Sequence, residues 1–170
     1  MPEPPKNHLT ARCSCGNVEL EAIGDPITSA VCYCESCQQG SRQIEALPNG
    51  RAACGPDGGT PYVLYRKVRV EYSKGPRLLR GLKLRDESST RRVVASCCDS
   101  PVFLEFEKGH WLSVYRTALR GDVPLPEMRV HTKSRPAGID LPDDVPSYSG
   151  YSFKFMAKLF GAWIAMLLRR

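Results

Sequence analysis

The chain of 170 residues lacks any uninterrupted apolar run of the ~20 residues needed to cross a bilayer, which excludes a transmembrane segment. Residues 1–10 are rich in proline and polar side chains and lack the apolar centre of a signal peptide, so we expect no export. Inside the cell, cysteines stay reduced and a disulfide framework is disfavoured. These absences predict a cytoplasmic protein, either free or held at the surface of a membrane.

The chain also lacks internal repeats, low-complexity tracts and an aromatic-rich nucleic-acid motif. Its formal net charge of +6 is concentrated in residues 61–120, which hold 13 Lys/Arg and 6 Asp/Glu. Such a basic segment suits nucleic acid, anionic lipid or an acidic small molecule. The cations alternate with apolar residues, as between Arg66 and Val70, which favours the solvated outer face of a sheet. We therefore expect no specific nucleic-acid partner.

Cysteine is the residue type that stands out, with eight copies in the chain. Seven of them fall into three clusters, which are Cys13 and Cys15, then Cys32, Cys34 and Cys37, then Cys97 and Cys98. Only Cys54 stands alone, in a Gly/Pro-rich loop over residues 48–60. Thiolates one to three residues apart converge on one soft cation more readily than they form disulfides, whose geometry is demanding. The spacing therefore predicts zinc sites.

Short strands account for most of the remaining chain. Residues 18–23 alternate apolar and charged side chains, as expected for a strand with one buried face. Five further stretches continue the series, at residues 68–72, 77–84, 92–96, 102–106 and 111–115. Turn signals such as Gly24-Asp25-Pro26 separate the stretches. The pattern predicts an antiparallel, mainly β domain, with a short helical turn over residues 35–41.

The last twenty residues, 151–170, differ in character from the rest. Apolar residues recur there at helical spacing, at Phe153, Met156, Ala157, Phe160, Trp163, Ile164, Leu167 and Leu168. Cations bracket this run, at Lys154, Lys158, Arg169 and Arg170. The segment is predicted to be an amphipathic helix, too short to span a bilayer. Residues 152–170 are expected either to pack on the domain, to join two copies as a homodimer, or to lie in a membrane interface.

The three-cysteine cluster suggests an open metal site. A structural zinc site uses all four tetrahedral positions, whereas a catalytic site leaves one for water or substrate. The C-x-C-x-x-C run of Cys32, Cys34 and Cys37 lets one loop wrap a metal from three sides. One position is then left open.

The other two clusters are predicted to combine. Cys13 and Cys15 cannot satisfy zinc alone, and Cys97 and Cys98 are the remaining cluster. Joining them would tie the first strand to a late hairpin. Adjacent residues of a strand point to opposite faces, so a bulge or turn is needed to bring both late cysteines to one metal. A disulfide between Cys97 and Cys98 is the alternative.

The order of these motifs resembles a known family. C-x-C-G at residues 13–16, C-x-C-x-x-C at residues 32–37, and Cys-x-Ser-Pro at residues 98–101 resemble the glutathione-dependent formaldehyde-activating enzyme family, which includes the domain of centromere protein V. Later stretches are also similar to that family, at residues 113–119, 126–131 and 144–146. The resemblance covers residues 9–150. It divides the chain into a zinc-binding domain, 9–150, and a C-terminal helix, 151–170.

The resemblance implies a zinc-binding β-tent of two antiparallel sheets. It implies a structural zinc on Cys13, Cys15 and the late cysteines, and an active-site zinc on Cys32, Cys34 and Cys37. The family is associated with carbon–sulfur lyase chemistry, in which formaldehyde and glutathione condense to S-hydroxymethylglutathione and the reaction reverses.

A zinc with three thiolate ligands suits this chemistry, because it accepts an added thiol and holds it as the thiolate. The thiolate is then placed to attack a small carbonyl group. We predict Cys32, Cys34 and Cys37 as the catalytic centre. Arg42 and Arg51 are candidates for binding the carboxylates of a tripeptide, from their positions in the chain alone.

Two departures from the family pattern point to a related branch. Ala95 stands where the family has the first cysteine of a late C-x-x-C-G, and Cys97 appears instead. Gln38 and Gln39 stand where the family often has two arginines, so an anion clamp is missing there. Three functions remain open: a carbon–sulfur lyase acting on a small thiol, a non-catalytic zinc module that binds a protein or a membrane surface, and a thiolate redox or metal sensor.

Overall fold

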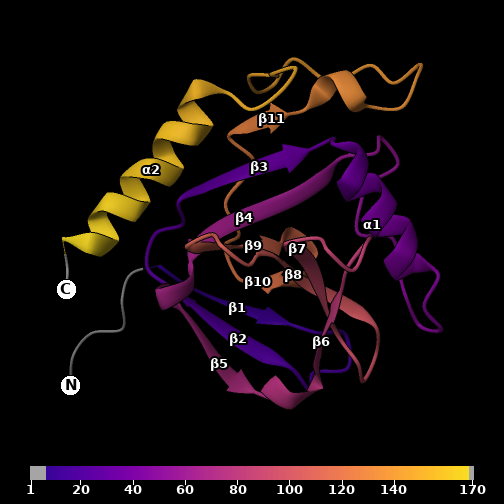
Figure 1. Ribbon diagram of the computed structural model, residues 1–170, viewed down its shortest axis with the longest axis vertical. Helices are drawn as coiled ribbons and strands as arrows, with labels where there is room; N and C mark the ends of the chain where they lie inside the picture. The colour runs from indigo at the N-terminus through magenta and orange to yellow at the C-terminus, as the bar shows by residue number, and fades with distance from the viewer. Residues whose placement is uncertain (1–6, 169–170) are drawn as a thin grey trace.

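The computed structural model describes residues 7–168 as two β-sheets flanked by two α-helices (Figure 1). The four-stranded sheet has the order β10 (Leu119–Arg120), β1 (His8–Arg12), β2 (Glu19–Ile23) and β5 (Val70–Lys74). The seven-stranded sheet has the order β11 (Met128–Val130), β3 (Thr28–Cys32), β4 (Thr60–Arg66), β9 (Trp111–Tyr115), β8 (Ser100–Phe106), β7 (Thr90–Ala95) and β6 (Leu79–Leu82). The predicted mainly β fold with two sheets is confirmed.

Neighbouring strands run antiparallel in both sheets, apart from the parallel pair β3 and β11. In β2, Leu20 and Ala22 are buried while the glutamates between and beside them are half-exposed, as the alternation predicts. Strand β4 lies inside the large sheet between β3 and β9, and its residues 62–65 are all buried. The core therefore contains one face of β2, whose apolar residues alternate with polar ones, and both faces of β4, whose buried residues are consecutive.

Helix α1 (Glu35–Glu45) is longer than the short turn expected over residues 35–41. The sulfur of Cys34 caps it by accepting a hydrogen bond from the backbone N–H of Cys37 at 3.4 Å. The extra turn places Ile44 in the core, fully buried. Burial of this apolar side chain explains why the helix continues beyond Ser41. The polar residues next to Ile44 do not by themselves form a helical pattern.

Two predicted strands begin later than expected, because a 3₁₀ turn precedes each. The turn η1 (Lys67–Arg69) comes before β5, and η2 (Pro76–Leu78) comes before β6. Gly75 has a φ of 60°, and Pro76 starts the second turn with its ring-restricted φ. Two further 3₁₀ turns are η3 (Arg116–Ala118) and η4 (Thr132–Ser134).

Helix α2 (Phe153–Leu167) confirms the predicted C-terminal helix; Arg169 and Arg170 lie outside the described residues. Ser152 caps it by accepting a hydrogen bond from the N–H of Phe155 at 3.0 Å. The helix follows the outer side of the large sheet beside β3 (Figure 1), where Lys158 forms an ion pair with Glu127. Within residues 7–168, no helix combines the length and apolar character needed to cross a membrane.

Candidate metal centres and their cavity

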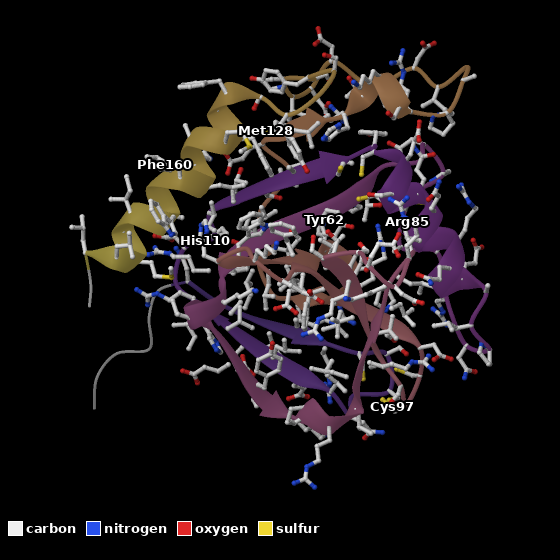
Figure 2. All side chains as sticks on the ribbon, viewed as in Figure 1. Tyr62, Arg85, Cys97, His110, Met128 and Phe160 are labelled. Atoms are coloured by element: carbon white, nitrogen blue, oxygen red, sulfur yellow. The ribbon has the colours of Figure 1, made fainter. Side chains whose placement is uncertain are left out.

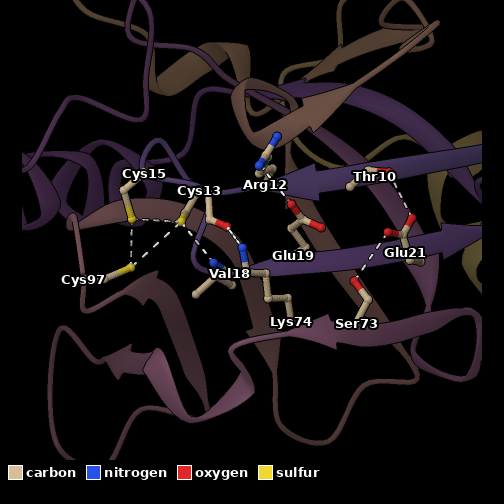
Figure 3. Close-up of polar contacts among 11 residues, drawn as sticks. Thr10, Arg12, Cys13, Cys15, Val18, Glu19, Glu21, Ser73, Lys74 and Cys97 are labelled. Atoms are coloured by element: carbon tan, nitrogen blue, oxygen red, sulfur yellow. Dashed lines mark hydrogen bonds and ion pairs between the residues drawn. The ribbon is translucent and has the colours of Figure 1, made fainter.

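Four cysteine sulfurs meet where two turns of the chain lie together. Cys13 and Cys15 follow β1, and Cys97 and Cys98 lie between β7 and β8. Figure 3 shows three of the four, Cys13, Cys15 and Cys97, with their sulfurs side by side. All four sulfurs lie within 4.8 Å of one another, and the Cys13–Cys15, Cys13–Cys97 and Cys15–Cys97 distances are 3.6, 3.9 and 3.3 Å. Sulfurs placed tetrahedrally at about 2.3 Å from one zinc are about 3.8 Å apart. The donor set therefore fits a structural zinc.

A turn explains how adjacent cysteines reach one centre. The N–H groups of Cys98 and Asp99 both donate to the carbonyl of Ala95, and Asp99 has a φ of 55°. Cys97 and Cys98 thus belong to a turn rather than a strand, with their sulfurs 4.0 Å apart. All eight cysteines of the chain, each within the described residues, are free thiols, so the alternative of a Cys97–Cys98 disulfide does not apply here.

Hydrogen bonds favour the thiolate form at Cys98, whereas burial and hydrogen bonds with Cys15 and Cys13 raise the pKa of Cys97. Burial by itself raises the pKa of Cys98, but hydrogen bonds involving Ser100 and Ser14 outweigh it and lower that pKa to about 5. The hydroxyl of Ser100 lies 3.1 Å from the Cys98 sulfur. The N–H of Val18 donates to the Cys13 sulfur at 3.3 Å. Donors aimed at sulfur favour the charged form that binds metal.

The second centre lies at the join of β3 and α1. Cys32 ends the strand, Cys34 caps the helix and Cys37 lies in its first turn. Their sulfurs lie within 4.8 Å of one another, and the group has three members among residues 7–168. Cys32 and Cys37 are buried, while Cys34 is half-buried. Local chain geometry therefore brings three donors together without help from a distant segment.

Crowding of these sulfurs separates their pKa values. Hydrogen bonds from Cys32 and Cys37 lower the pKa of Cys34, and the hydrogen bond to Cys34 raises the pKa of Cys32. For Cys37, the contact with Cys32 lowers the pKa, but the hydrogen bond to Cys34 and burial outweigh it and raise the pKa to about 12. The cluster by itself thus favours one thiolate. Ionising all three thiols requires a cation, and three sulfur donors suit zinc.

A cavity of about 360 Å³ adjoins the three-cysteine centre. Besides the three cysteines, it is lined by Ala30, Ser36, Tyr62, Leu64, Thr90, Leu104, Phe106, Trp111, Ser113, Val130, Tyr151, Phe155, Met156 and Leu159. These residues come from the large sheet, the start of α1 and the first half of α2, apart from Tyr151, which lies just before α2. Figure 2 shows Tyr62 in the interior of the fold, with Phe160 on α2 at its edge. The cavity is therefore closed on one side by the C-terminal helix.

Tyr62 is a site residue that the sequence analysis did not identify. Its hydroxyl lies 3.5 Å from the Cys37 sulfur, and its ring packs 5.0 Å from that of Tyr115. Burial raises the pKa of Tyr62 well above its ordinary value, and Tyr115 and Cys37 add to the effect. Tyr62 therefore keeps its proton and can donate it in a hydrogen bond to the sulfur. Its place in a buried strand offered no signal of this role.

The two predicted substrate-binding arginines lie elsewhere. Arg42 and Arg51 are both exposed, and neither lines the cavity, so the lining does not support a role for them in binding carboxylates. Gln38 donates hydrogen bonds to the carbonyls of Tyr33 and Ser134, both at 2.8 Å. It therefore ties α1 to η4 instead of facing a substrate.

Comparison with known proteins agrees with the motifs. Among solved structures, the chain is similar to the crystal structure of a Rhodobacter sphaeroides protein solved as a structural genomics target. The identity is 16% and the TM-score 0.47, over 68% of this chain and 91% of that chain, which is too weak to support conclusions. No curated protein matched significantly. The model of the family described as "Glutathione-dependent formaldehyde-activating enzyme" matches residues 8–47, which hold five of the clustered cysteines, and over that segment the resemblance to this family is confirmed.

Proposed function

We propose that this protein joins a small thiol to an aldehyde, and cleaves the adduct again, at a zinc held by Cys32, Cys34 and Cys37. The observation that supports the proposal is the position of these sulfurs, which converge within 4.8 Å and line the wall of a cavity. The family match over residues 8–47 points to the same class, glutathione-dependent formaldehyde activation. We propose that the four-cysteine centre is structural, since its four donors complete a tetrahedral set.

The chemistry requires no oxidant. In the forward direction, the thiol sulfur forms a bond to the carbonyl carbon, the π electrons move to the carbonyl oxygen, and that oxygen takes up the proton that the thiol lost. A zinc with three cysteine ligands would supply an open position and lower the pKa of an added thiol. Proximity of the two reactants in one cavity supplies much of the remaining gain.

The residues of the chain hold and shield this centre. Cys32, Cys34 and Cys37 are fixed by the end of β3 and the first turn of α1. The hydroxyl of Tyr62 donates toward the Cys37 sulfur and disperses its charge. Tyr151, whose ring stacks 5.3 Å from that of Phe155, lines the cavity while remaining partly exposed.

Metal content tests the proposal most directly. We expect two zincs per native chain and one in Cys34→Ser, with the fold retained because the four-cysteine centre remains. Cys54→Ser is the matched control, since Cys54 belongs to neither centre, and it should keep two zincs. Replacing zinc by cobalt in the three-cysteine centre should then give an absorption spectrum that changes when a thiol is added. An absorption spectrum that stays unchanged when a thiol is added would argue strongly against catalysis.

A second candidate function is a non-catalytic module that binds a membrane surface through α2. It is favoured by apolar side chains that remain exposed along this helix, namely Phe153, Met156, Phe160, Trp163, Ile164, Leu167 and Leu168. Deleting residues 152–170 should abolish binding to anionic liposomes if this function is correct. Loss of a dimer in the same variant would instead indicate that the helix joins two copies.

A further inference from the structure

The cavity beside the three-cysteine centre has an apolar lining that helps to define its substrate. We infer that the site takes an uncharged thiol with an apolar tail, together with its aldehyde adduct, in preference to glutathione. This inference rests on the proposed function, because the tail occupies the cavity while the thiol sulfur meets the three cysteines.

The lining contains no opposite charge for glutathione. Within residues 7–168, none of the side chains that line the cavity is Asp, Glu, Lys, Arg or His. Glutathione carries two carboxylates and an ammonium group, and placing charges in an apolar site without partners is strongly unfavourable. Its charged ends would have to remain outside, leaving the apolar walls in contact with water.

A buried cation beside α1 does not change this conclusion. Arg92 is almost fully buried, and its guanidinium donates a hydrogen bond to the backbone carbonyl of Ser36. Although Ser36 lines the cavity, Arg92 does not. Its side chain packs against Gly40 on the buried face of α1. Arg92 therefore supports α1 without forming part of the cavity wall.

The apolar walls come from two separate parts of the chain. Leu104, Phe106 and Trp111 belong to strands of the large sheet, with the rings of Phe106 and Trp111 6.1 Å apart. Phe155 and Leu159 belong to α2, and they are its buried residues. The helix lies outside residues 8–47, the segment that the family model matches.

The few polar groups of the lining suit the reacting end of the substrate. The lining residues that carry hydroxyl groups are Ser36, Tyr62, Thr90, Ser113 and Tyr151. An adduct formed from a thiol and an aldehyde has one new hydroxyl, which needs only one or two hydrogen-bond partners. A volume of about 360 Å³ lies at the lower end of the range of small-molecule sites, about 300–1,000 Å³.

A matched set of thiols tests the inference on the full chain, with cobalt in the three-cysteine centre and the absorption spectrum as readout. Propane-1-thiol and 3-mercaptopropionate differ chiefly in one carboxylate, and glutathione is the third probe. We expect propane-1-thiol to bind at least about tenfold more tightly than either charged thiol. Affinity should rise up to about fourfold for each methylene added from propane- to pentane-1-thiol.

Two variants on α2 test whether the cavity lining causes the preference for uncharged over charged thiols. Met156 lines the cavity and is half-exposed, so Met156→Lys should fold and bring a cation to its rim. This variant should bind 3-mercaptopropionate more tightly and propane-1-thiol more weakly than the native chain does. Phe160→Lys is the control, since Phe160 is similarly exposed on the same helix but does not line the cavity. It should leave both affinities unchanged.

The outcomes separate the inference from the proposed function. If glutathione or 3-mercaptopropionate binds as tightly as propane-1-thiol, the inference is wrong while thiol binding at the centre stands. Equal effects of Met156→Lys and Phe160→Lys would also overturn it, because the cavity would not be the source of the selectivity. If no thiol changes the spectrum, the proposed function and the inference both fail.

Discussion

The guanidinium of Arg92 lies so close to Gly40 that a Cβ at Gly40 would be 1.7 Å from Nε of Arg92. This close approach joins β7 to the middle of α1, the helix that carries Cys37. Arg92 also donates to the carbonyl of Ser36, in the first turn of the same helix. The position of the three-cysteine centre therefore depends on a helix face that has room for an arginine.

Gly40→Ala should accordingly displace α1. We expect it to lower the free energy of unfolding by about 3 kcal/mol, as overpacking of a rigid core does, and to weaken zinc binding at the three-cysteine centre. Gly161→Ala in α2 is the matched control, since nothing lies within 4 Å of a Cβ built there, and alanine favours a helix. Urea unfolding of the zinc-loaded proteins measures the free energy of unfolding of the two variants. Equal stabilities of the two variants would contradict the packing described.

The two centres should differ in their contribution to stability. Cys13 and Cys97 lie 84 residues apart in the sequence, so the four-cysteine centre closes a long loop, whereas the three-cysteine centre closes a short one. We expect Cys13→Ser to lower the Tm by about 10 °C, and Cys34→Ser to lower it by much less. Thermal unfolding with and without a chelator provides the comparison. A larger loss in Cys34→Ser would mean that its centre is the structural one.

Glu105 should make stability depend on acidic pH. Burial alone would raise its pKa, but hydrogen bonds from Lys67 and Arg91, at 2.8 and 2.6 Å, outweigh this and hold the pKa below its ordinary value of 4.5. A carboxylate whose pKa falls on folding stabilises the protein above its unfolded pKa, and the effect is lost as pH falls through the folded pKa.

We therefore expect Glu105→Gln to be less stable than the native chain at pH 7, with the difference shrinking below pH 4.5. Thermal unfolding between pH 3 and 7 measures the difference, and acid release of zinc affects both proteins alike. Glu87→Gln is the control, because Glu87 and its partner Arg85 are both well exposed and 3.9 Å apart. A gap between Glu105→Gln and the native chain that stays constant with pH would refute the assignment.

Phe155 should anchor α2 on the sheet. It is 7% exposed and stacks on Tyr151, whereas Phe153 on the same helix is 90% exposed. Phe155→Ala should cost about 3 kcal/mol through loss of apolar burial, much of it seen as local release of the helix. Phe153→Ala should change stability by less than about 0.5 kcal/mol. Amide hydrogen exchange over residues 153–167 should be faster in Phe155→Ala than in the native chain, and unchanged in Phe153→Ala. Equal exchange rates in both variants would show that Phe155 does not anchor the helix.

Short-range patterns predicted the parts of the fold that depend on neighbouring residues. Strand β9 has the expected bounds, residues 111–115, and the C-terminal helix follows its apolar spacing. The strands that were not expected are β1, β3, β4, β10 and β11. Strand β3, for example, pairs with β4 and β11, which both lie far from it in the sequence. The length of α1 was also missed, since the burial of Ile44 depends on the core around it.

By itself, the sequence determined which cysteines can share a metal, because Cys32, Cys34 and Cys37 lie close together at the join of a strand and a helix, and their spacing is a local property. Only the tertiary structure decided what surrounds that centre. Trp111 and Phe155 are 44 residues apart in number, yet they line one cavity, whereas Arg42, close to the cysteines in sequence, is exposed and does not line it. A cavity is enclosed by side chains that strand pairing and helix packing bring together, and no local pattern records which distant residues those will be.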